Sequence, residues 1–303
     1  FPVLFLGAKP SNTPSFYNFM NYADFGLGTW HPKGGMYEVI KGMVSLAKSL
    51  GVDFENYANV EKIAVKNNKV EGLWIDDYLV KSDLVVSGAD YVHTEQLLPE
   101  ANRQYTDEYW NKKTFAPSSL LFYVGLNKPV ENVEHHTLFF DTDFDAHAES
   151  IYDTPEWPEK PLFYASFPSK TDATIAPEGK EAAIFLIPLA PGIEDSDEIR
   201  AVYFEKIIDR LEKLTKQDIR SHILFKESFG INNFIEDYNS YKGNAYGLAN
   251  TLMQTAFLRP KLKSNRVKGL YFTGQLTVPG PGVPPSLISG KLTADLVKKY
   301  ELK

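Results

Sequence analysis

Apolar and polar positions in the first third of the chain follow helical spacing and then strand spacing. Apolar residues from Met36 to Leu50 recur three and four positions apart, which predicts an amphipathic helix. Residues 62–66 and 69–75 flank the turn pair Asn67-Asn68 and predict a β-hairpin. Residues 83–90 form an apolar run that ends in small residues, which predicts a buried strand. The predicted fold class is therefore α/β, with mixed α+β character.

The middle of the chain, roughly 93–239, is dominated by strand patterns. One clear helix is predicted from about Asp197 to Thr215, with Asp195 and Glu198 resembling a capping box at its start. The proline-bearing acidic segments 141–161 and 172–181 are expected to be solvated loops. This pattern is typical of a substrate domain built on a mixed or antiparallel sheet with helical cover. Its predicted strands are 120–125, 137–141, 162–167, 183–188 and 223–229.

Near the end of the chain, an apolar strand, a turn dense in glycine and proline, and a helix follow one another between Gly269 and Lys291. The helix is predicted to begin at Pro284 or Pro285. Backbone N–H groups and the positive end of the helix dipole would meet at this turn, which favours an anionic or electron-rich ligand. Glycines in the turn would let a flat ring lie on the backbone. Both part of a cofactor cradle and a tight structural turn fit the pattern.

Composition narrows the function classes. The chain has 303 residues, enough for two intertwined domains, and is 43% hydrophobic and 23% charged, as in globular proteins. A net charge of −7 with scattered basic residues argues against nucleic-acid binding. The absence of cysteine excludes disulfides, thiolate metal sites and a cysteine nucleophile. The longest apolar run, 182–193, is too short to span a bilayer, which predicts a soluble or peripheral protein.

Short catalytic motifs are missing from the sequence. There is no GxGxxG, Walker A, HExxH or GxSxG pattern. His135 and His136 are expected on a strand with their side chains on opposite faces, so no metal site is predicted. His31, beside a glycine loop, is interpreted as a positioned polar residue rather than a catalytic base. Residue types alone therefore name no reaction.

The order of segments resembles the carotenoid desaturase (phytoene dehydrogenase) family of flavoproteins, specifically the bacterial all-trans phytoene desaturases. The resemblance covers the middle and C-terminal parts of that family. This chain lacks the family's N-terminal GxGxxG half, which binds the FAD pyrophosphate and ribose. It is therefore expected to be a piece of a longer polypeptide, and the isolated chain need not be active. The segments that carry the resemblance are 1–7, 29–36, 59–63, 84–90, 254–260 and 270–291.

The resemblance implies a two-domain fold like that of FAD-dependent amine oxidases and phytoene desaturases. Residues 31–92 and 240–303 would form parts of the FAD-binding domain. Residues 1–30 and 93–239 would form the substrate-binding domain.

The resemblance also implies which residues meet the FAD. Val60 would approach the adenine through its backbone, and Ala89 and Asp90 would line the cofactor channel. Gly274 and Gln275 would approach the ribityl-phosphate.

At the flavin itself, the amides around Gly282 and Val283 would face the N1/C2 carbonyl edge, together with the helix dipole. Here the sequence departs from the family, because Pro284 and Pro285 follow in succession and remove two N–H donors. Only the amides of Gly282, Val283, Ser286 and Leu287 would then remain available to donate hydrogen bonds to the flavin. Catalytic side chains proposed for the family lie upstream of Phe1, so no catalytic residue is predicted within this chain.

The implied activity is FAD-dependent desaturation of a linear carotenoid, phytoene to lycopene, by successive hydride transfer to flavin N5. The alternatives are a carotenoid 3,4-desaturase, another isoprenoid or amine oxidase of the same fold, and, more remotely, a non-enzymatic isoprenoid escort protein. The expected partners are a hydrophobic carotenoid and quinone or oxygen as electron acceptor. A cytoplasmic, peripherally membrane-associated protein is expected, docking through residues 16–25 or 182–193.

Overall fold

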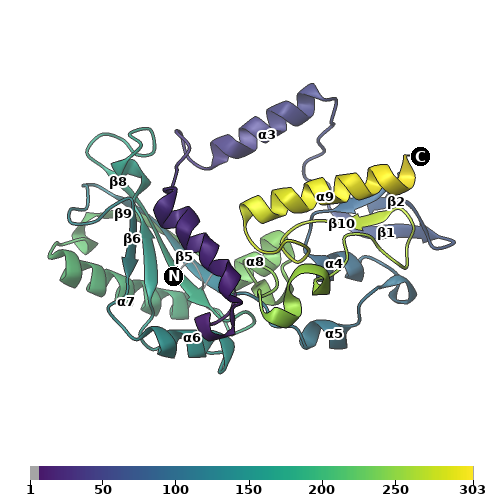
Figure 1. Cartoon of the computed structure of the whole chain (residues 1–303). Helices are drawn as coiled ribbons and strands as arrows, with labels where there is room; N and C mark the ends of the chain where they lie inside the picture. Colours follow the sequence, from purple (N-terminus) through teal and green to yellow (C-terminus); the bar gives the residue numbers. More distant parts are fainter. Residues whose placement is uncertain (1–6, 303) are drawn as a thin grey trace. The chain divides into compact units, whose positions relative to one another are not determined.

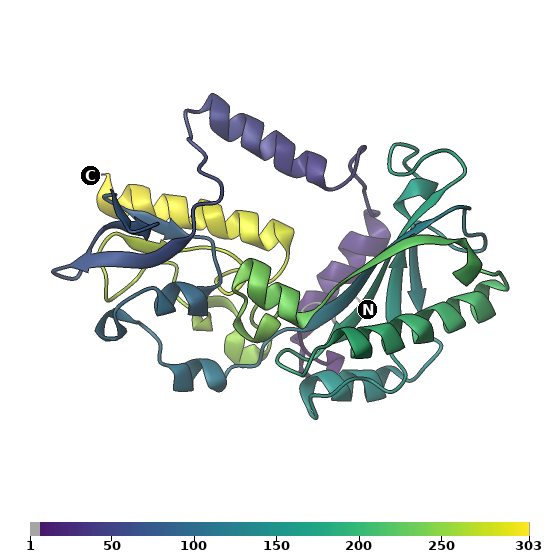
Figure 2. The same cartoon turned by 180° about the vertical axis from the view of Figure 1, so that it is seen from behind.

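The computed structural model describes residues 7–302, which fall into two compact units (Figure 1, Figure 2). Within the described residues, unit 1 contains residues 7–20, 55–117 and 233–302, and unit 2 contains residues 21–54 and 118–232. Each unit is therefore built from segments far apart in the sequence. The assignment of cofactor and substrate domains to particular residues stays a prediction.

A three-stranded antiparallel sheet forms one part of unit 1. Its strands are β1 (Val60–Lys66), β2 (Lys69–Ile75) and β3 (Tyr78–Lys81), in the order β1-β2-β3. Asn67 and Asn68 join β1 to β2 with φ angles of 51° and 57°. Asparagine tolerates this left-handed region, so a two-residue turn forms here and the predicted hairpin is confirmed.

A parallel strand pair forms the second part of unit 1. β4 (Val85–Ser87) lies beside β10 (Leu270–Phe272), and α9 (Val283–Glu301) packs on β10 through a hydrogen bond from Thr293 Oγ1 to the Phe272 carbonyl oxygen at 2.9 Å. The buried ring of Tyr91 stacks on Phe272 with a centroid distance of 3.8 Å. The remaining α-helices of the described residues that fall in this unit are α4 (Tyr91–Gln96), α5 (Asp107–Asn111), most of α8 (Ile231–Tyr238) and the first two residues of α2 (Phe19–Asn21).

Unit 2 is built on a five-stranded antiparallel sheet in the order β6-β7-β8-β5-β9. α7 (Asp197–Thr215) packs on this sheet, and the rings of Phe204 and Phe122 meet with a centroid distance of 5.1 Å. The predicted antiparallel arrangement with helical cover is confirmed. The strands are β5 (Ser118–Leu126), β6 (His136–Phe139), β7 (Phe163–Ser166), β8 (Glu181–Leu189) and β9 (Ile223–Phe229).

Two expectations for unit 2 are wrong. α6 (Phe144–Tyr152) occupies part of the segment expected to be a solvated loop, because Asp143 caps its first turn and His147, Ala148 and Ile151 are buried. The capping residue of α7 is Ser196, whose side chain accepts from the Ile199 amide. Asp195 is not available for capping, since its carboxylate pairs with Arg200.

The two segments expected to dock on a membrane differ in exposure. Residues 182–193 include most of β8, in which Phe185, Ile187 and Leu189 are fully buried, so this segment forms core rather than an apolar surface. In contrast, Phe19 and Phe25 are 76% and 77% exposed. No helix within residues 7–302 is long and apolar enough to cross a bilayer.

The predicted helix after the first glycine loop is confirmed as α3 (Tyr37–Ser49). None of its residues is buried, and its apolar positions Ile40, Met43 and Leu46 are exposed. Before α3, the described part of the chain contains short helical turns. These are η1 (Pro10–Asn12), η2 (Ser15–Asn18), α2 (Phe19–Asn21) and η3 (Tyr22–Gly26).

Candidate cofactor site

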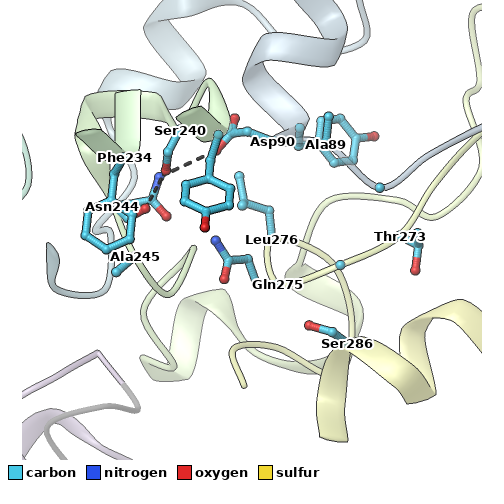
Figure 3. A pocket seen from close by; sticks show the side chains of 14 residues that line it. Ala89, Asp90, Phe234, Ser240, Asn244, Ala245, Thr273, Gln275, Leu276 and Ser286 are labelled. Atoms are coloured by element: carbon cyan, nitrogen blue, oxygen red, sulfur yellow. Dashed lines mark hydrogen bonds between the residues drawn. The ribbon is translucent and has the colours of Figure 1, made fainter. Parts of the chain in front are cut away.

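A pocket of about 410 Å³ lies in unit 1 where β4 and β10 end (Figure 3). The strands are parallel, so the residues that follow them, Gly88 to Asp90 and Thr273 to Leu276, lie at the same edge. Crevices at the carboxyl ends of parallel strands are common ligand sites. The pocket is completed by Tyr91, Phe234, Tyr238, Ser240, Asn244, Ala245 and Ser286.

Asp90 joins two parts of the pocket wall. One carboxylate oxygen caps α4 by accepting from the amides of Val92 and His93, at 2.9 and 3.3 Å. The other accepts from the Tyr241 amide at 3.2 Å and from Asn244 Nδ2 at 3.5 Å. Burial raises the pKa of Asp90, while these hydrogen bonds act in the opposite direction. Because both oxygens already have protein partners, Asp90 shapes the pocket wall.

The opposite wall depends on Gly274. Its φ is 105°, in a region that glycine adopts readily, and a Cβ placed there would have the Gly88 carbonyl oxygen, at 3.8 Å, as its only close neighbour. A Cβ on Gly88 would likewise meet only the Thr273 side chain, at 3.8 Å. Bare backbone therefore surrounds open space at the ends of both strands, a cradle that side chains would fill.

A buried hydroxyl anchors the 274–282 loop to α9. Ser289 Oγ accepts from the Gly274 amide at 3.0 Å and lies 3.0 Å from Thr273 Oγ1 and 2.7 Å from Thr277 Oγ1. Ser289 and Thr277 are both fully buried. The shape of the loop is thus set by a hydroxyl cluster around Ser289, which lies nearly two helical turns inside α9.

The start of α9 has no side-chain cap. Gly282 is its N-cap residue, with a φ of 110°, and Val283 is the first helical residue. The Ser286 amide donates to the Gly282 carbonyl oxygen at 3.0 Å, so it is engaged within the helix. Ser286 lines the pocket as a residue, while its amide is not available to a ligand.

Five of the eight residues predicted to bind the cofactor line this one pocket: Ala89, Asp90, Gly274, Gln275 and Ser286. The other three do not line it. Val60 is the first residue of β1, and Gly282 and Val283 lie at the exposed start of α9.

The sequence did not predict the wall formed by residues 234–245. Asn244 is 1% exposed, accepts from the Gly247 amide at 2.7 Å, and approaches Asp90 across a separation of 154 residues. The clustering of Asn, Tyr and Gly in this irregular stretch was the only sequence signal.

The pocket is suited to binding rather than to proton transfer. Its ionisable lining residues are Asp90, Tyr91 and Tyr238. Asp90 is engaged as described, and burial raises the pKa of Tyr91 well above its ordinary value. Tyr91 also donates to the Lys261 carbonyl oxygen at 3.0 Å. Amide, hydroxyl and bare backbone groups remain, which suits an extended polar ligand such as the ribityl and phosphate portion of FAD.

A second cavity, of about 700 Å³, lies in unit 2 and contains three histidines. The rings of His135 and His136 stack with a centroid distance of 4.1 Å, so the expected opposite orientation is wrong. β6 begins only at His136, and strand alternation therefore does not apply to the pair. No group of three or more His, Asp or Glu side chains within residues 7–302 is arranged to hold a metal ion.

His31 belongs to this second cavity. Its ring lies 4.8 Å from that of His135, and its Nε2 atom is buried without a hydrogen-bond partner among the described residues. Burial and the neighbouring imidazoles lower the pKa of His135 to about 4. The cluster is therefore neutral at His135 near pH 7.

Sequence comparison places this chain among flavoproteins. The profile of the family described as "Flavin containing amine oxidoreductase" matches residues 3–298. A carotenoid 3,4-desaturase from Haloarcula japonica is 46% identical over 299 residues, which cover 97% of this chain and 60% of the relative. A zeta-carotene-forming phytoene desaturase from Myxococcus xanthus is 30% identical over 304 residues, with coverage of 97% and 57%. The resemblance to carotenoid desaturases and the prediction of a flavin cofactor are confirmed.

Solved structures confirm the fold class. An oxidoreductase from Methanosarcina mazei superposes with a TM-score of 0.64 at 18% identity, covering 92% of this chain and 58% of that one. A putrescine oxidase variant superposes with a TM-score of 0.52 at 12% identity, covering 87% and 53%. This chain thus spans about 60% of the length of the curated relatives it matches.

Proposed function

Because this chain belongs to the flavin containing amine oxidoreductase family, we propose that it forms the larger part of an FAD-dependent desaturase acting on a linear carotenoid. The observation that carries the proposal is the pair of bare strand ends at Gly88 and Gly274, which lets a polar cofactor lie against the backbone. The carotenoid names of the relatives support the substrate class.

Two substrate assignments follow from the comparisons. Phytoene to lycopene is the conversion that the sequence resemblance implies, and relatives at 30% and 32% identity act on phytoene and diapophytoene by name. The 46% identity to a carotenoid 3,4-desaturase favours a later substrate that is already conjugated. We therefore propose 3,4-desaturation as the second candidate activity. Lycopene is the first substrate with which to test it.

The chain's own residues would bind and orient the cofactor. When bound, FAD accepts the hydride removed from an allylic CH₂–CH₂ unit of the polyene, and loss of a neighbouring proton completes the double bond. Gly88 and Gly274 would admit the ribityl-phosphate portion, and Ser289 would keep the 274–282 loop in place beneath it. The start of α9, with its positive dipole end, would favour negative charge at Gly282 and Val283.

Membrane contact, a cytoplasmic location and a quinone or oxygen acceptor belong to the same proposal. A carotenoid substrate partitions into bilayers, so the enzyme would collect it from a lipid surface. The exposed aromatic side chains Phe16, Phe19 and Phe25 are the segment that would make this contact.

The proposal is tested by incubating the flavin-loaded protein with phytoene or lycopene in liposomes, with a quinone present. Longer conjugation shifts the absorption maximum of the extracted pigment to the red, and the substrate that gives this shift decides between the two candidates. A purified protein that stays colourless after refolding with excess FAD would contradict the proposed desaturase function. Binding of isoprenoid by such a colourless protein would support the escort alternative instead.

A further inference from the structure

Arg259 is a buried cation without a carboxylate partner. It is 2% exposed, and within residues 7–302 its guanidinium donates only to carbonyl oxygens: Nε to Thr277 at 3.1 Å, and Nη2 to Leu248 at 2.8 Å. Nη1 reaches Leu248 and Gln254, each at 3.3 Å. No carboxylate among residues 7–302 forms an ion pair with it.

Such a group is expensive to bury. Desolvation lowers its pKa to about 10, so the guanidinium still carries its charge at neutral pH. A buried charge of this kind is normally paired, because neighbouring opposite charge offsets the loss of hydration. The fold therefore keeps a positive charge at this position that is held by carbonyl oxygens alone among the described residues.

The charge lies directly against the 274–282 loop. A Cβ built on Gly280 would stand 3.0 Å from Arg259 Nη2 and 3.0 Å from Asn250 Oδ1. The two atoms are thus within about 6 Å of each other, a distance over which buried charges interact strongly. Asn250 is 2% exposed, and its Oδ1 atom has no hydrogen-bond partner among the described residues.

We propose that Arg259 is a positioning residue of the cofactor site, which holds the 274–282 loop and supplies positive charge on the buried side of that loop. The inference rests on the proposed function, in which Gly282 and Val283 face the flavin. Reduction adds negative charge to the flavin, so a fixed cation beneath the loop raises its reduction potential. The hydrogen bond to the Thr277 carbonyl oxygen joins this charge to the loop at the same residue whose hydroxyl contacts Ser289.

Asn250→Asp is the sharpest test, because it places a negative charge near Arg259 without removing any of the carbonyl oxygens that Arg259 binds. The measurement is the midpoint potential of the bound flavin, from reduction by xanthine and xanthine oxidase against a reference dye. We expect a more negative potential with an unchanged or higher melting temperature. Asn265 is exposed and lies six residues after Arg259 in the sequence. Asn265→Asp makes the same charge change there and should leave the midpoint potential unchanged.

Arg259→Lys and Arg259→Gln separate charge from hydrogen bonding. Lysine keeps the charge but lacks the planar set of guanidinium donors, so we expect Arg259→Lys to bind FAD more weakly with a midpoint potential close to wild type. Glutamine removes the charge as well, so we expect Arg259→Gln to lower both the FAD affinity and the midpoint potential. This pair decides the question if Asn250→Asp does not fold. A wild-type potential in Asn250→Asp, or equal potentials in the lysine and glutamine variants, would overturn the proposal. A wild-type protein that binds no flavin would instead overturn the proposed function on which it rests.

Discussion

At the scale of single residues, Gly274 combines two requirements. Its φ of 105° suits glycine, and its amide donates to Ser289 Oγ while its Cα faces the pocket. A side chain at this position would strain the backbone and also occupy open space in the pocket that we propose holds FAD. Both effects follow from the missing Cβ. Backbone strain changes the free energy of unfolding, whereas lost space changes the affinity for the ligand.

Gly274→Ala should weaken FAD binding by about tenfold or more, equivalent to about 1.4 kcal/mol, since the new methyl group points into the cradle. Flavin fluorescence titration measures the change. Gly179→Ala is the matched control, because Gly179 has a φ of 74° and a Cβ placed on it would meet nothing within 4 Å. Equal FAD affinity in the two variants would contradict the role assigned to Gly274.

Ser289→Ala should lower the free energy of unfolding by about 1–3 kcal/mol, because the Gly274 amide loses its acceptor in a buried place. Urea denaturation measures this loss. Ser45→Ala, on the exposed helix α3, should change stability by less than about 0.5 kcal/mol. A neutral result at Ser289 would show that water replaces the hydroxyl.

At the scale of elements, the start of α7 shows how a buried ion pair fixes a junction. Asp195 accepts from Arg200 Nε at 2.8 Å, and the same carboxylate accepts from the Asn232 amide at 3.0 Å. Asp195 and Arg200 side chains are 1% and 8% exposed. The pair therefore connects the first turn of α7 to the start of α8.

Arg200→Ala should destabilise the protein by about 3–5 kcal/mol, because it leaves the Asp195 carboxylate buried and uncompensated. Arg220→Ala is the comparison, since Arg220 also binds carboxylates but its side chain is 46% exposed, where an ion pair contributes about 0–1 kcal/mol. Chemical denaturation of both variants tests the difference. Similar losses would mean that burial of the Asp195 pair does not matter.

Local patterns predicted the elements better than the contacts between them. The hairpin at Asn67-Asn68 and helix α3 follow from spacing and turn chemistry within a few residues. The capping of α7 was wrong because Asp195 pairs with a side chain that periodicity does not locate. The 234–245 wall was missed for the same reason, since Asp90 organises it from more than 150 residues away.

At the scale of the whole molecule, one buried group in each unit links stability to pH, and the two groups act in opposite directions. In unit 1, burial raises the pKa of Glu95 from 4.5 to about 7. The folded state therefore binds more protons than the unfolded state between these values, and stability falls as the pH rises from 4.5 to about 7. In unit 2, burial lowers the pKa of His147 from 6.5 to about 4. There the unfolded state binds more protons, so stability is lost as the pH falls from 6.5 to about 4.

Removing each group should remove its own pH dependence. His147 accepts from the Leu162 amide and contacts the Pro188 carbonyl oxygen, so glutamine can replace both interactions without titrating. We expect His147→Gln to gain stability relative to wild type as the pH is lowered from about 7 to about 5, and Glu95→Gln to gain as the pH is raised over the same interval. Native-state hydrogen exchange in α6 and α4, corrected for intrinsic rates, reports the two units separately. Glu100→Gln, at an exposed position in unit 1, should follow the wild-type curve. Parallel curves for the buried-site variants and wild type would show that neither group links folding to protonation.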